Sequence, residues 1–360
     1  MTKKILLLFL SIPLFGISQQ QINKTMIYDG NAREYIVYIP ASYDGSNSYP
    51  LLFSFHGGGG TSGDFINTND MRPIADTAGF IAVYPQAAID PDDGSFSWLH
   101  KAPTNHNDIF YIEAIIDTLS IEYMIDNNRV YACGYSEGAI FSYELACRLN
   151  NRIAAFASIS GSMLYDDFRS SYYDFGNCSP IHPTAAMFML GTEDENPHGS
   201  YSGLFPYYMS VDDISSYWSL YNNTDVSPIS YQIPDLNMFD GVYLNGTISN
   251  STIERKVWEN GDNCVRVEEW KVVNGGHDWP GILGNMDISA SNEIWNFVSK
   301  FDINGLIDCN TTIHQEINNF QKRKTLVVTD MLGRNVKELK NIPLIYLKDD
   351  GTVEKRIILE

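Results

Sequence analysis

The sequence predicts an α/β protein built on a mostly parallel β-sheet that is covered by helices on both faces. Short, continuously apolar segments alternate with segments of helical periodicity, which is the pattern of strands buried on both faces. Several of the apolar segments run directly into glycine-rich or acidic loops, as strands of a parallel sheet do at a shared edge. The chain has 360 residues, of which 44% are hydrophobic, enough to form one large core.

The first 18 residues, MTKKILLLFLSIPLFGIS, predict a signal peptide. Lys3 and Lys4 precede an apolar run at residues 5–15, and small residues follow near an expected cleavage point. The apolar run is shorter than the 18 or more residues of a membrane span, which disfavours the alternative of a membrane anchor. We therefore expect a secreted or cell-surface protein whose residues 19–305 form the main domain.

Periodicity gives the remaining elements in chain order. Residues 34–40 alternate between apolar and polar and end in proline, which is typical of a half-buried or edge strand. Residues 107–125, 138–149 and 289–301 have the spacing of amphipathic helices. Buried strands followed by loops are predicted within residues 50–60, 79–86, 129–136, 153–161, 185–195 and 267–281.

Four of the loops carry residues capable of chemistry. Because ligands of such sheets bind beyond the carboxyl ends of the strands, we expect these loops to meet at one edge of the sheet. The four loops are His56–Gly60, Gly134–Gly138, Gly191–Asp194 and Gly275–His277.

The second loop, GYSEG, places a serine between a predicted strand and a predicted helix. Ser136 is flanked by Gly134 and Gly138, which omit side chains where strand and helix approach closely. A serine on a strained turn of this kind serves as the nucleophile in acyl transfer. The context therefore predicts that Ser136 is a nucleophile, and an ordinary tight turn is the alternative.

A serine nucleophile requires a base, and the base requires an acid that orients it. Of the seven histidines, His277 combines a strand end, neighbouring glycines and a position after a candidate acid. Asp194 follows a predicted strand and is the expected acid, so the order is Ser136, Asp194, His277. The alternative acids are Glu193, Glu195 and Asp278.

The developing oxyanion requires N–H donors that are already in place. The candidates are the amides of Glu137, next to the serine, and Gly58, in the loop after His56. The helix that starts after Ser136 adds its positive end, worth up to about 1 kcal/mol. Glu137 also brings a negative charge, which would oppose catalysis unless its side chain points into solvent. We expect the ring of His56 to hold the glycine loop.

Two tryptophans lie in polar loops near the predicted site. Trp279 is two residues from His277, and we expect its flat face to hold an acyl group or a sugar. Trp98 is a second candidate for substrate contact. Residues 198–262, rich in Tyr, Ser and Asn, are expected to supply the variable part of the pocket. No C-x-x-C or His/Cys cluster indicates a metal, and no cofactor is expected.

Charge and cysteine content restrict the partners and the compartment. The formal net charge of −20 disfavours nucleic acid and anionic membranes as partners. Five cysteines in an exported protein leave at least one free thiol. We expect a disulfide between Cys147 and Cys178, and a buried free thiol at Cys133.

Seven blocks between residues 26 and 301 occur in an order that resembles a known family. They are FHGGGGTSGDF, IADTAGFIAVYPQ, NDIFYIEAIID, IDNNRVYACGYSEGA, LGTEDENPHGSYSG, VNGGHDWPG and DISASNEIWNFV. Together they resemble secreted esterases of the polyhydroxybutyrate depolymerase / feruloyl esterase group, related to carbohydrate esterase family 1. The resemblance implies an α/β-hydrolase fold and ester hydrolysis, with Ser136, Asp194 and His277 at the triad positions.

The chain departs from this family pattern at three places. Gly58 stands where the family often has cysteine, and the elbow reads GYSEGA where sequences such as SNGG or SAGG are usual. Leu190 stands where a histidine is usual. None of these departures removes a member of the expected triad.

Residues 306–360 are expected to form a linker and a short C-terminal β tail. Residues 325–360 resemble the sorting tail of proteins exported by the type IX secretion system, through DMLGR and DDGTVEKRIILE. Residues 311–360 carry nine Lys and Arg against seven Asp and Glu, unlike the acidic body. The resemblance implies the secretion machinery as a partner, and an additional hairpin of the main domain is the alternative.

These observations predict a secreted serine carboxylic-ester hydrolase that acts through an acyl-enzyme. The expected substrate is a feruloyl or acetyl ester on polysaccharide. A polyhydroxybutyrate-type polyester is the alternative substrate. A surface binding protein on a hydrolase scaffold, without turnover, is the alternative class, motivated by Glu137 and the altered elbow.

Overall fold

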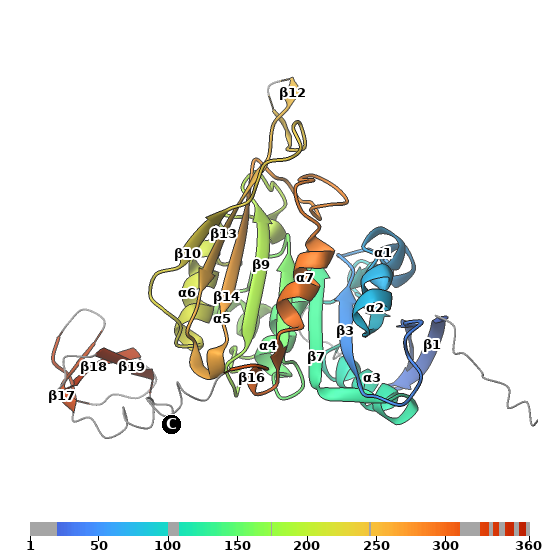
Figure 1. The fold of residues 1–360 in the computed structure, drawn as a ribbon, viewed down its shortest axis with the longest axis horizontal. Helices are drawn as coiled ribbons and strands as arrows, with labels where there is room; N and C mark the ends of the chain where they lie inside the picture. The colour runs from blue at the N-terminus through green and yellow to red at the C-terminus, as the bar shows by residue number, and fades with distance from the viewer. Residues whose placement is uncertain are drawn as a thin grey trace, which may run out of the picture.

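A ten-stranded β-sheet forms the centre of the computed structural model (Figure 1). The order is β1 (Gln20–Tyr28), β2 (Asn31–Ile39), β4 (Ile81–Pro85), β3 (Tyr49–Phe55), β7 (Ile125–Tyr135), β8 (Ala155–Ile159), β9 (Ala185–Gly191), β14 (Val267–Val273), β13 (Thr252–Trp258) and β10 (Ile229–Gln232). The structure describes residues 20–99, 108–173, 175–244, 246–309, 325–330, 334–337, 343–348 and 353–357. The predicted signal peptide, residues 1–18, lies outside the described residues.

The six central strands, β4 to β14 in that order, are parallel. The two strands at each edge pair antiparallel, which is how β1, β2, β13 and β10 extend the sheet. The predicted parallel sheet is therefore confirmed for the centre. The edge strands β1 and β10 were not predicted, because they are only partly buried or exposed and lack a continuous apolar pattern.

Helices cover both faces of the sheet, as predicted. One core contains apolar residues of α3 (Asp108–Glu122), α4 (Glu137–Arg148) and α6 (Val211–Tyr221). The core on the other face contains residues of α1 (Ser62–Thr68), α2 (Arg72–Ala78) and α7 (Ala290–Val298). The strands contribute alternately to the two cores: Phe53 and Phe55 of β3 belong to the first, and Leu52 to the second. Burial on both faces explains why the central strands read as continuous apolar runs.

Smaller elements surround the sheet. The described part of the chain also contains α5 (Asp166–Tyr172), the 3₁₀ turns η1 (Pro197–Gly199) and η2 (Asp262–Cys264), and the two-residue strand pairs β5 (Ala88–Ile89) with β6 (Phe96–Ser97), β11 (Tyr243–Leu244) with β12 (Thr247–Ile248), and β15 (Phe301–Asp302) with β16 (Gly305–Leu306). The arm that carries β11 and β12 projects at the top of Figure 1. The amide of Val242 donates to the carbonyl of Asn274, so the arm starts beside the carboxyl end of β14.

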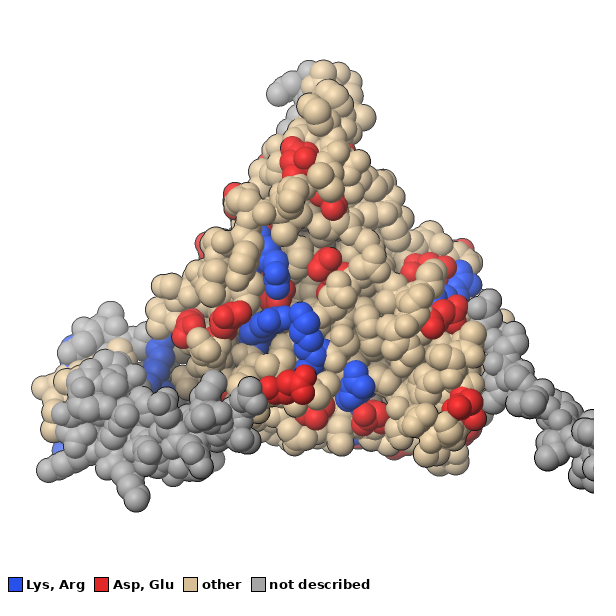
Figure 2. All heavy atoms as spheres, viewed as in Figure 1, with Lys and Arg blue, Asp and Glu red and all other residues tan. Residues whose placement is uncertain are grey.

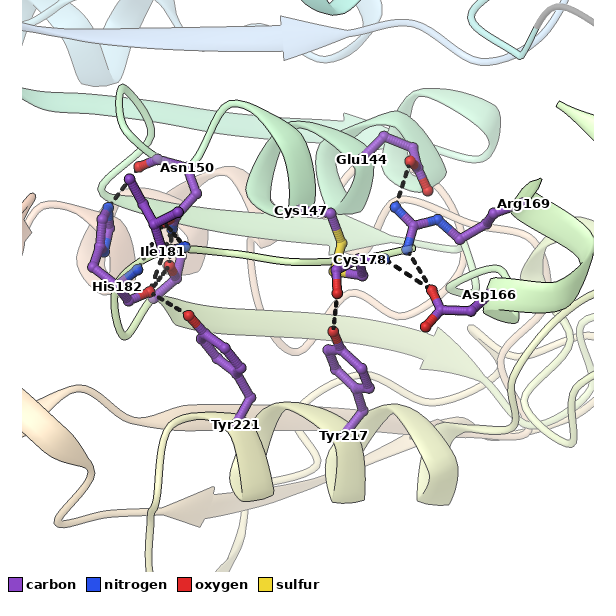
Figure 3. Close-up of a disulfide and its surroundings, with 11 residues drawn as sticks. Glu144, Cys147, Asn150, Asp166, Arg169, Cys178, Ile181, His182, Tyr217 and Tyr221 are labelled. Carbon is purple, nitrogen blue, oxygen red and sulfur yellow. Dashed lines mark hydrogen bonds and ion pairs between the residues drawn. A yellow bond between two sulfur atoms is a disulfide. The ribbon is translucent and has the colours of Figure 1, made fainter. Parts of the chain in front are cut away.

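Two disulfides cross-link segments that are distant in sequence. Cys147 of α4 is bonded to Cys178, which confirms the predicted pair (Figure 3). The hydroxyl of Tyr217 on α6 donates to the Cys178 carbonyl, so the bridged loop is also held by a second helix. Cys264 is bonded to Cys309, a pair that the sequence did not identify, and it extends the covalent framework past residue 305. Cys133 is free and buried, as predicted.

The acidic composition does not make the surface uniformly negative. Figure 2 shows Lys and Arg side chains gathered in a band on the face seen in Figure 1, with Asp and Glu around them. On and beside the strand pair β13–β14, Arg255 and Arg266 both form ion pairs with the buried Glu268. The charge distribution on one face therefore depends on which side chains form ion pairs there, as well as on the net charge of the protein.

The C-terminal segment contains a three-stranded antiparallel sheet of β17 (Thr325–Asp330), β18 (Pro343–Lys348) and β19 (Val353–Ile357). This agrees with the short β tail expected from the sequence. Leu344 and Tyr346 of the middle strand are buried.

Candidate active site

Ser136 lies on a sharp turn between β7 and α4. Its backbone has φ 56° and ψ −120°, a conformation that a residue with a side chain adopts only when its surroundings enforce it. A Cβ on Gly134 would lie 2.2 Å from the carbonyl oxygen of Gly138, and one on Gly138 would lie 2.3 Å from that of Phe55. Strand, helix and neighbouring strand thus approach so closely that both glycines are required.

The structure brings the three residues of the expected triad into one hydrogen-bonded chain. His277 Nε2 lies 2.8 Å from Ser136 Oγ, and His277 Nδ1 lies 2.7 Å from Asp194 Oδ2. In the arrangement that satisfies both contacts, Nδ1 donates to the carboxylate and Nε2 accepts from the serine hydroxyl. The Asp194 side chain is fully buried, whereas that of His277 is 22% exposed. The exposed edge of the imidazole is open to a reactant.

Further contacts hold the acid and the histidine in place. Asp194 Oδ1 accepts a hydrogen bond from the amide of Asn196, and the hydroxyl of Tyr135 donates to the carbonyl of His277. Asp278 is engaged elsewhere, because its Oδ2 accepts from the amide of Gly276. Burial raises the pKa of Asp278 above its ordinary value. Of the four acidic candidates, Asp194 is the one hydrogen-bonded to His277.

Gly199 is a site residue that sequence reasoning missed. A Cβ there would lie 2.1 Å from Asp194 Oδ2 and 2.8 Å from His277 Nδ1. Any side chain would therefore push into the contact between acid and base. The segment PHGS gave no local signal of this role, because the close approach is made by chain segments far apart in sequence.

His198 lies close to the triad without joining it. Its Nδ1 is 2.7 Å from the hydroxyl of Tyr208. Burial lowers the pKa of His198, and the neighbouring His277 lowers it further. A neutral His198 adds no second positive charge beside the imidazole of His277.

The glycine loop after β3 lies on the other side of Ser136. A Cβ on Gly57 would be 3.3 Å from the Ser136 Cβ, so this part of the loop packs directly on the serine. The amides of Gly59 and Gly60 donate to the carbonyls of Phe96 and Gly57. Gly58 lies against the side chain of Glu137. The two expected oxyanion donors, the amides of Gly58 and Glu137, therefore belong to adjacent segments.

His56 holds this loop, as expected. Its Nδ1 is 2.7 Å from the carbonyl of Gly57, and its Nε2 accepts from the amide of Ala87. Burial lowers the His56 pKa to about 4, so the ring is neutral at pH 7. A neutral ring with Nδ1 protonated satisfies both contacts.

The side chain of Glu137 points into the protein, so its charge is not removed from the site by exposure to solvent. The residue is 8% exposed, and its Oε1 accepts hydrogen bonds from the amides of Trp98 and Leu99, at 2.6 and 2.8 Å, and from the hydroxyl of Ser97. A buried carboxylate needs such donors, because leaving water without them is strongly unfavourable. The donors lie about forty residues earlier in the chain, which is why the sequence did not reveal them.

The expected substrate contacts of the two tryptophans are also wrong. Trp98 is 1% exposed, because its ring stacks on Phe141 and its Nε1 donates to the carbonyl of His56. Trp279 is 3% exposed, and its Nε1 donates to Ser291 Oγ. Both rings are packed inside the protein, so neither offers a free face to a substrate. Trp98 instead supports the start of the glycine loop through its bond to His56.

A cleft of about 500 Å³ opens on the His277 side of the site. It is lined by Glu193, Glu195, Asn196, Gly241, Val242, Tyr243, Gly276, His277, Asp278, Leu283 and Gly284. The residues from the arm belong to the region 198–262 that was expected to supply the variable part of the pocket. The cleft combines hydrogen-bond acceptors with aliphatic and aromatic side chains, which is typical of small-molecule sites.

The described residues contain neither a cluster of metal ligands nor a helix suited to a membrane. No group of three or more His, Cys, Asp and Glu side chains among the described residues is placed to hold a metal ion. Within the described ranges, none of the helices has the length and apolar character needed to span a bilayer.

The curated proteins that this chain resembles in sequence are esterases. No family model matches the chain. It is 25% identical over 284 residues to the bifunctional acetylxylan esterase/xylanase XynS20E of Neocallimastix patriciarum, which covers 79% of this chain and 36% of that protein. It is 29% identical over 141 residues to a probable feruloyl esterase C of Aspergillus niger, covering 38% of this chain and 50% of that one. The chain spans between about a third and a half of the length of these relatives.

A solved structure identifies the fold. The acetyl xylan esterase from Aspergillus awamori matches with a TM-score of 0.53 at 13% identity, over 78% of this chain and 99% of that one. The fold is the α/β-hydrolase fold, as the family resemblance implies. At the level of sequence, the chain is a homologue of feruloyl and acetylxylan esterases.

Proposed function

We propose that the protein is a serine carboxylic-ester hydrolase that removes feruloyl or acetyl groups from polysaccharide through an acyl-enzyme. The observation that carries this proposal is the hydrogen-bonded chain Ser136–His277–Asp194 on a strained strand-to-helix turn. The homology to feruloyl and acetylxylan esterases supports the same chemistry.

The proposed mechanism assigns each side chain one role. Ser136 Oγ attacks the ester carbonyl while His277 Nε2 takes its proton. The buried Asp194 carboxylate stabilises the imidazolium and fixes its orientation. The amides of Gly58 and Glu137 donate to the oxyanion. His277 then protonates the leaving alcohol, and a water molecule activated by the same imidazole releases the acid.

The position of the cleft supports a saccharide as the leaving alcohol. His277 protonates that alcohol, so the alcohol departs on the side where the cleft of about 500 Å³ opens. Carboxylates and the amide of Asn196 can accept or donate hydrogen bonds to sugar hydroxyls, and Tyr243 offers an aromatic surface. We also propose export through the signal peptide at residues 1–18 and the C-terminal tail.

A polyester is the second candidate substrate, and exposed apolar side chains around the cleft favour it. Phe239, Tyr243 and Leu283 are 66%, 71% and 60% exposed, and two of them line the cleft. Such side chains could adsorb to an apolar polymer. This arrangement supports a polyhydroxybutyrate-type depolymerase as the alternative.

A panel of ester substrates tests both candidate substrate classes, the polysaccharide esters and the polyester. Release of acetate from acetylated xylan or of ferulate from methyl ferulate, with little hydrolysis of polyhydroxybutyrate particles, is the expected result. Preferred hydrolysis of the particles would replace the first substrate class by the second. Absence of turnover on all of these and on p-nitrophenyl acetate, by folded protein, would overturn the proposed enzyme.

A further inference from the structure

We propose that Glu137 is a positioning residue that fixes the loop carrying Gly58, and that position 58 must be glycine because Glu137 follows the nucleophile. This inference rests on the proposed esterase function and deepens it, since the Gly58 amide is one of the two proposed oxyanion donors. It also gives a physical role to a buried acid that directly follows the proposed nucleophile.

One oxygen of Glu137 is held rigidly. Oε1 accepts from the hydroxyl of Ser97 and from the consecutive amides of Trp98 and Leu99. Three donors on one carboxylate oxygen stabilise the charged form, and the first turn of α4 adds the positive end of the helix. The side chain therefore connects the start of α4 to the segment 97–99.

The segment 97–99 is in turn joined to the glycine loop. The ring nitrogen of Trp98 donates to the carbonyl of His56 at 2.8 Å, and the amide of Gly59 donates to the carbonyl of Phe96 at 2.7 Å. Glu137 thus links the two segments that carry the proposed oxyanion donors through residues 96–99. A change in its side chain should alter the geometry of the oxyanion loop.

The other oxygen of Glu137 explains the glycine. A Cβ on Gly58 would lie 2.3 Å from Glu137 Oε2 and 3.4 Å from the carboxylate carbon. A free glutamate could swing away from such a contact at little cost. This one cannot do so without breaking its three hydrogen bonds. Any larger residue at position 58 would meet the same obstacle, so the identities of residues 58 and 137 are coupled.

A double-mutant cycle tests this coupling. We would measure kcat and KM for p-nitrophenyl acetate with the wild type, Gly58→Ala, Glu137→Ala and the double variant. Gly58→Ala should lower kcat by about 100-fold with little change in KM, because an oxyanion donor acts mainly in the transition state. Glu137→Ala should lower kcat by about 10-fold. The double variant should match Glu137→Ala, a recovery of about 10-fold over Gly58→Ala.

Controls separate positioning from a loss of folding. Gly63→Ala, five residues along, has a Cβ position 3.9 Å from its nearest atom and should leave kcat and the melting temperature unchanged. If Glu137→Ala fails to melt cooperatively, Glu137→Asp replaces it, because its carboxylate is one methylene shorter and withdraws from position 58. Adding Glu137→Asp to Gly58→Ala is then expected to restore kcat in the same way.

Three outcomes would overturn the inference: a fully active Gly58→Ala, a double variant in which the two losses simply multiply, or variants that lose stability but keep the wild-type kcat. Failure of the enzyme proposal looks different, because the wild type itself would then neither turn over an ester nor be labelled at Ser136. In that case the inference falls together with the function on which it rests.

Discussion

Helix α4 carries two buried glutamates two turns apart, and the protein accommodates their charges in different ways. Glu137, in the first turn, is bound by the hydroxyl of Ser97 and by backbone amides, which are neutral donors. Glu144, in the middle of the helix, forms an ion pair at 2.8 Å with Arg169, whose side chain is fully buried. Figure 3 shows this second pair beside the disulfide, with Asp166 on the other side of the guanidinium.

The difference follows from position along the helix. The first turn offers positive potential from the helix end, so a carboxylate there needs only neutral donors. The middle of the helix offers no such potential, and a buried carboxylate there requires a cation. Near the nucleophile, the first solution holds Glu137 without placing a cation next to His277. Substitutions at the first turn should therefore change kcat, and substitutions around Glu144 should change stability.

The largest effect is expected at Ser136, directly before the first turn. Ser136→Ala should reduce kcat by about 10⁴-fold or more and leave the melting temperature close to that of the wild type. Ser142→Ala is the matched control on α4, because its buried hydroxyl donates to the carbonyl of Gly138, within the helix itself. Steady-state kinetics and thermal melts of the two variants check this. Wild-type turnover by Ser136→Ala would contradict the distinction between the start of α4, where substitutions change kcat, and its middle, where they change stability.

The middle of α4 should show the opposite behaviour. Arg169→Met leaves the Glu144 carboxylate buried without its cation and should lower the free energy of unfolding by about 3–5 kcal/mol. The kcat of the folded fraction should not change. Glu144 Oε1 and Arg169 Nε make no hydrogen bond within the described part of the chain, so the pair is incompletely satisfied. The double variant Glu144→Leu/Arg169→Met should consequently recover most of the loss in urea unfolding.

The disulfide next to this pair should contribute somewhat less. Cys147 and Cys178 are separated by 31 residues, for which loop closure predicts a loss of about 3–4 kcal/mol in the double variant Cys147→Ser/Cys178→Ser. Cys133→Ala, a small change at a free buried thiol, is the control. Equal urea midpoints for Cys147→Ser/Cys178→Ser and Cys133→Ala would contradict a stabilising role of the disulfide.

Acid should destabilise the fold through His56, which holds the glycine loop beside the first turn of α4. The pKa of His56 is lowered by burial from 6.5 to about 4, so the unfolded chain binds the proton more readily. The stabilisation by neutral His56 is complete above pH 6.5 and is lost as the pH falls towards 4, by up to about 3 kcal/mol. His56→Gln should flatten the pH dependence of unfolding in this window. An unchanged slope would show that another group is responsible.

Local sequence was sufficient where short segments dictate geometry. The strand-to-helix turn at Ser136 could be predicted because Gly134 and Gly138 mark a close approach that only glycine permits. The parallel centre of the sheet could be predicted because strands buried on both faces are apolar throughout. The order of Asp194 and His277 along the chain then led to the arrangement that the structure contains.

Features that depend on distant contacts could not be predicted. The burial of Trp98 depends on Phe141, and that of Trp279 on Ser291. The direction of Glu137 depends on donors that precede it by about forty residues. A loop with polar composition therefore does not establish that its tryptophan is exposed, and a charged residue beside a nucleophile does not establish that its charge faces the reaction.

The central claim is that Ser136 is an activated nucleophile. Incubation of the full chain with a fluorophosphonate probe, followed by mass spectrometry of its peptides, tests this directly. We predict stoichiometric modification of Ser136 in the wild type and of no serine in Ser136→Ala, with labelling strongly slowed in His277→Ala. Folded wild-type protein that remains unmodified would contradict the account and would favour a binding protein on a hydrolase scaffold.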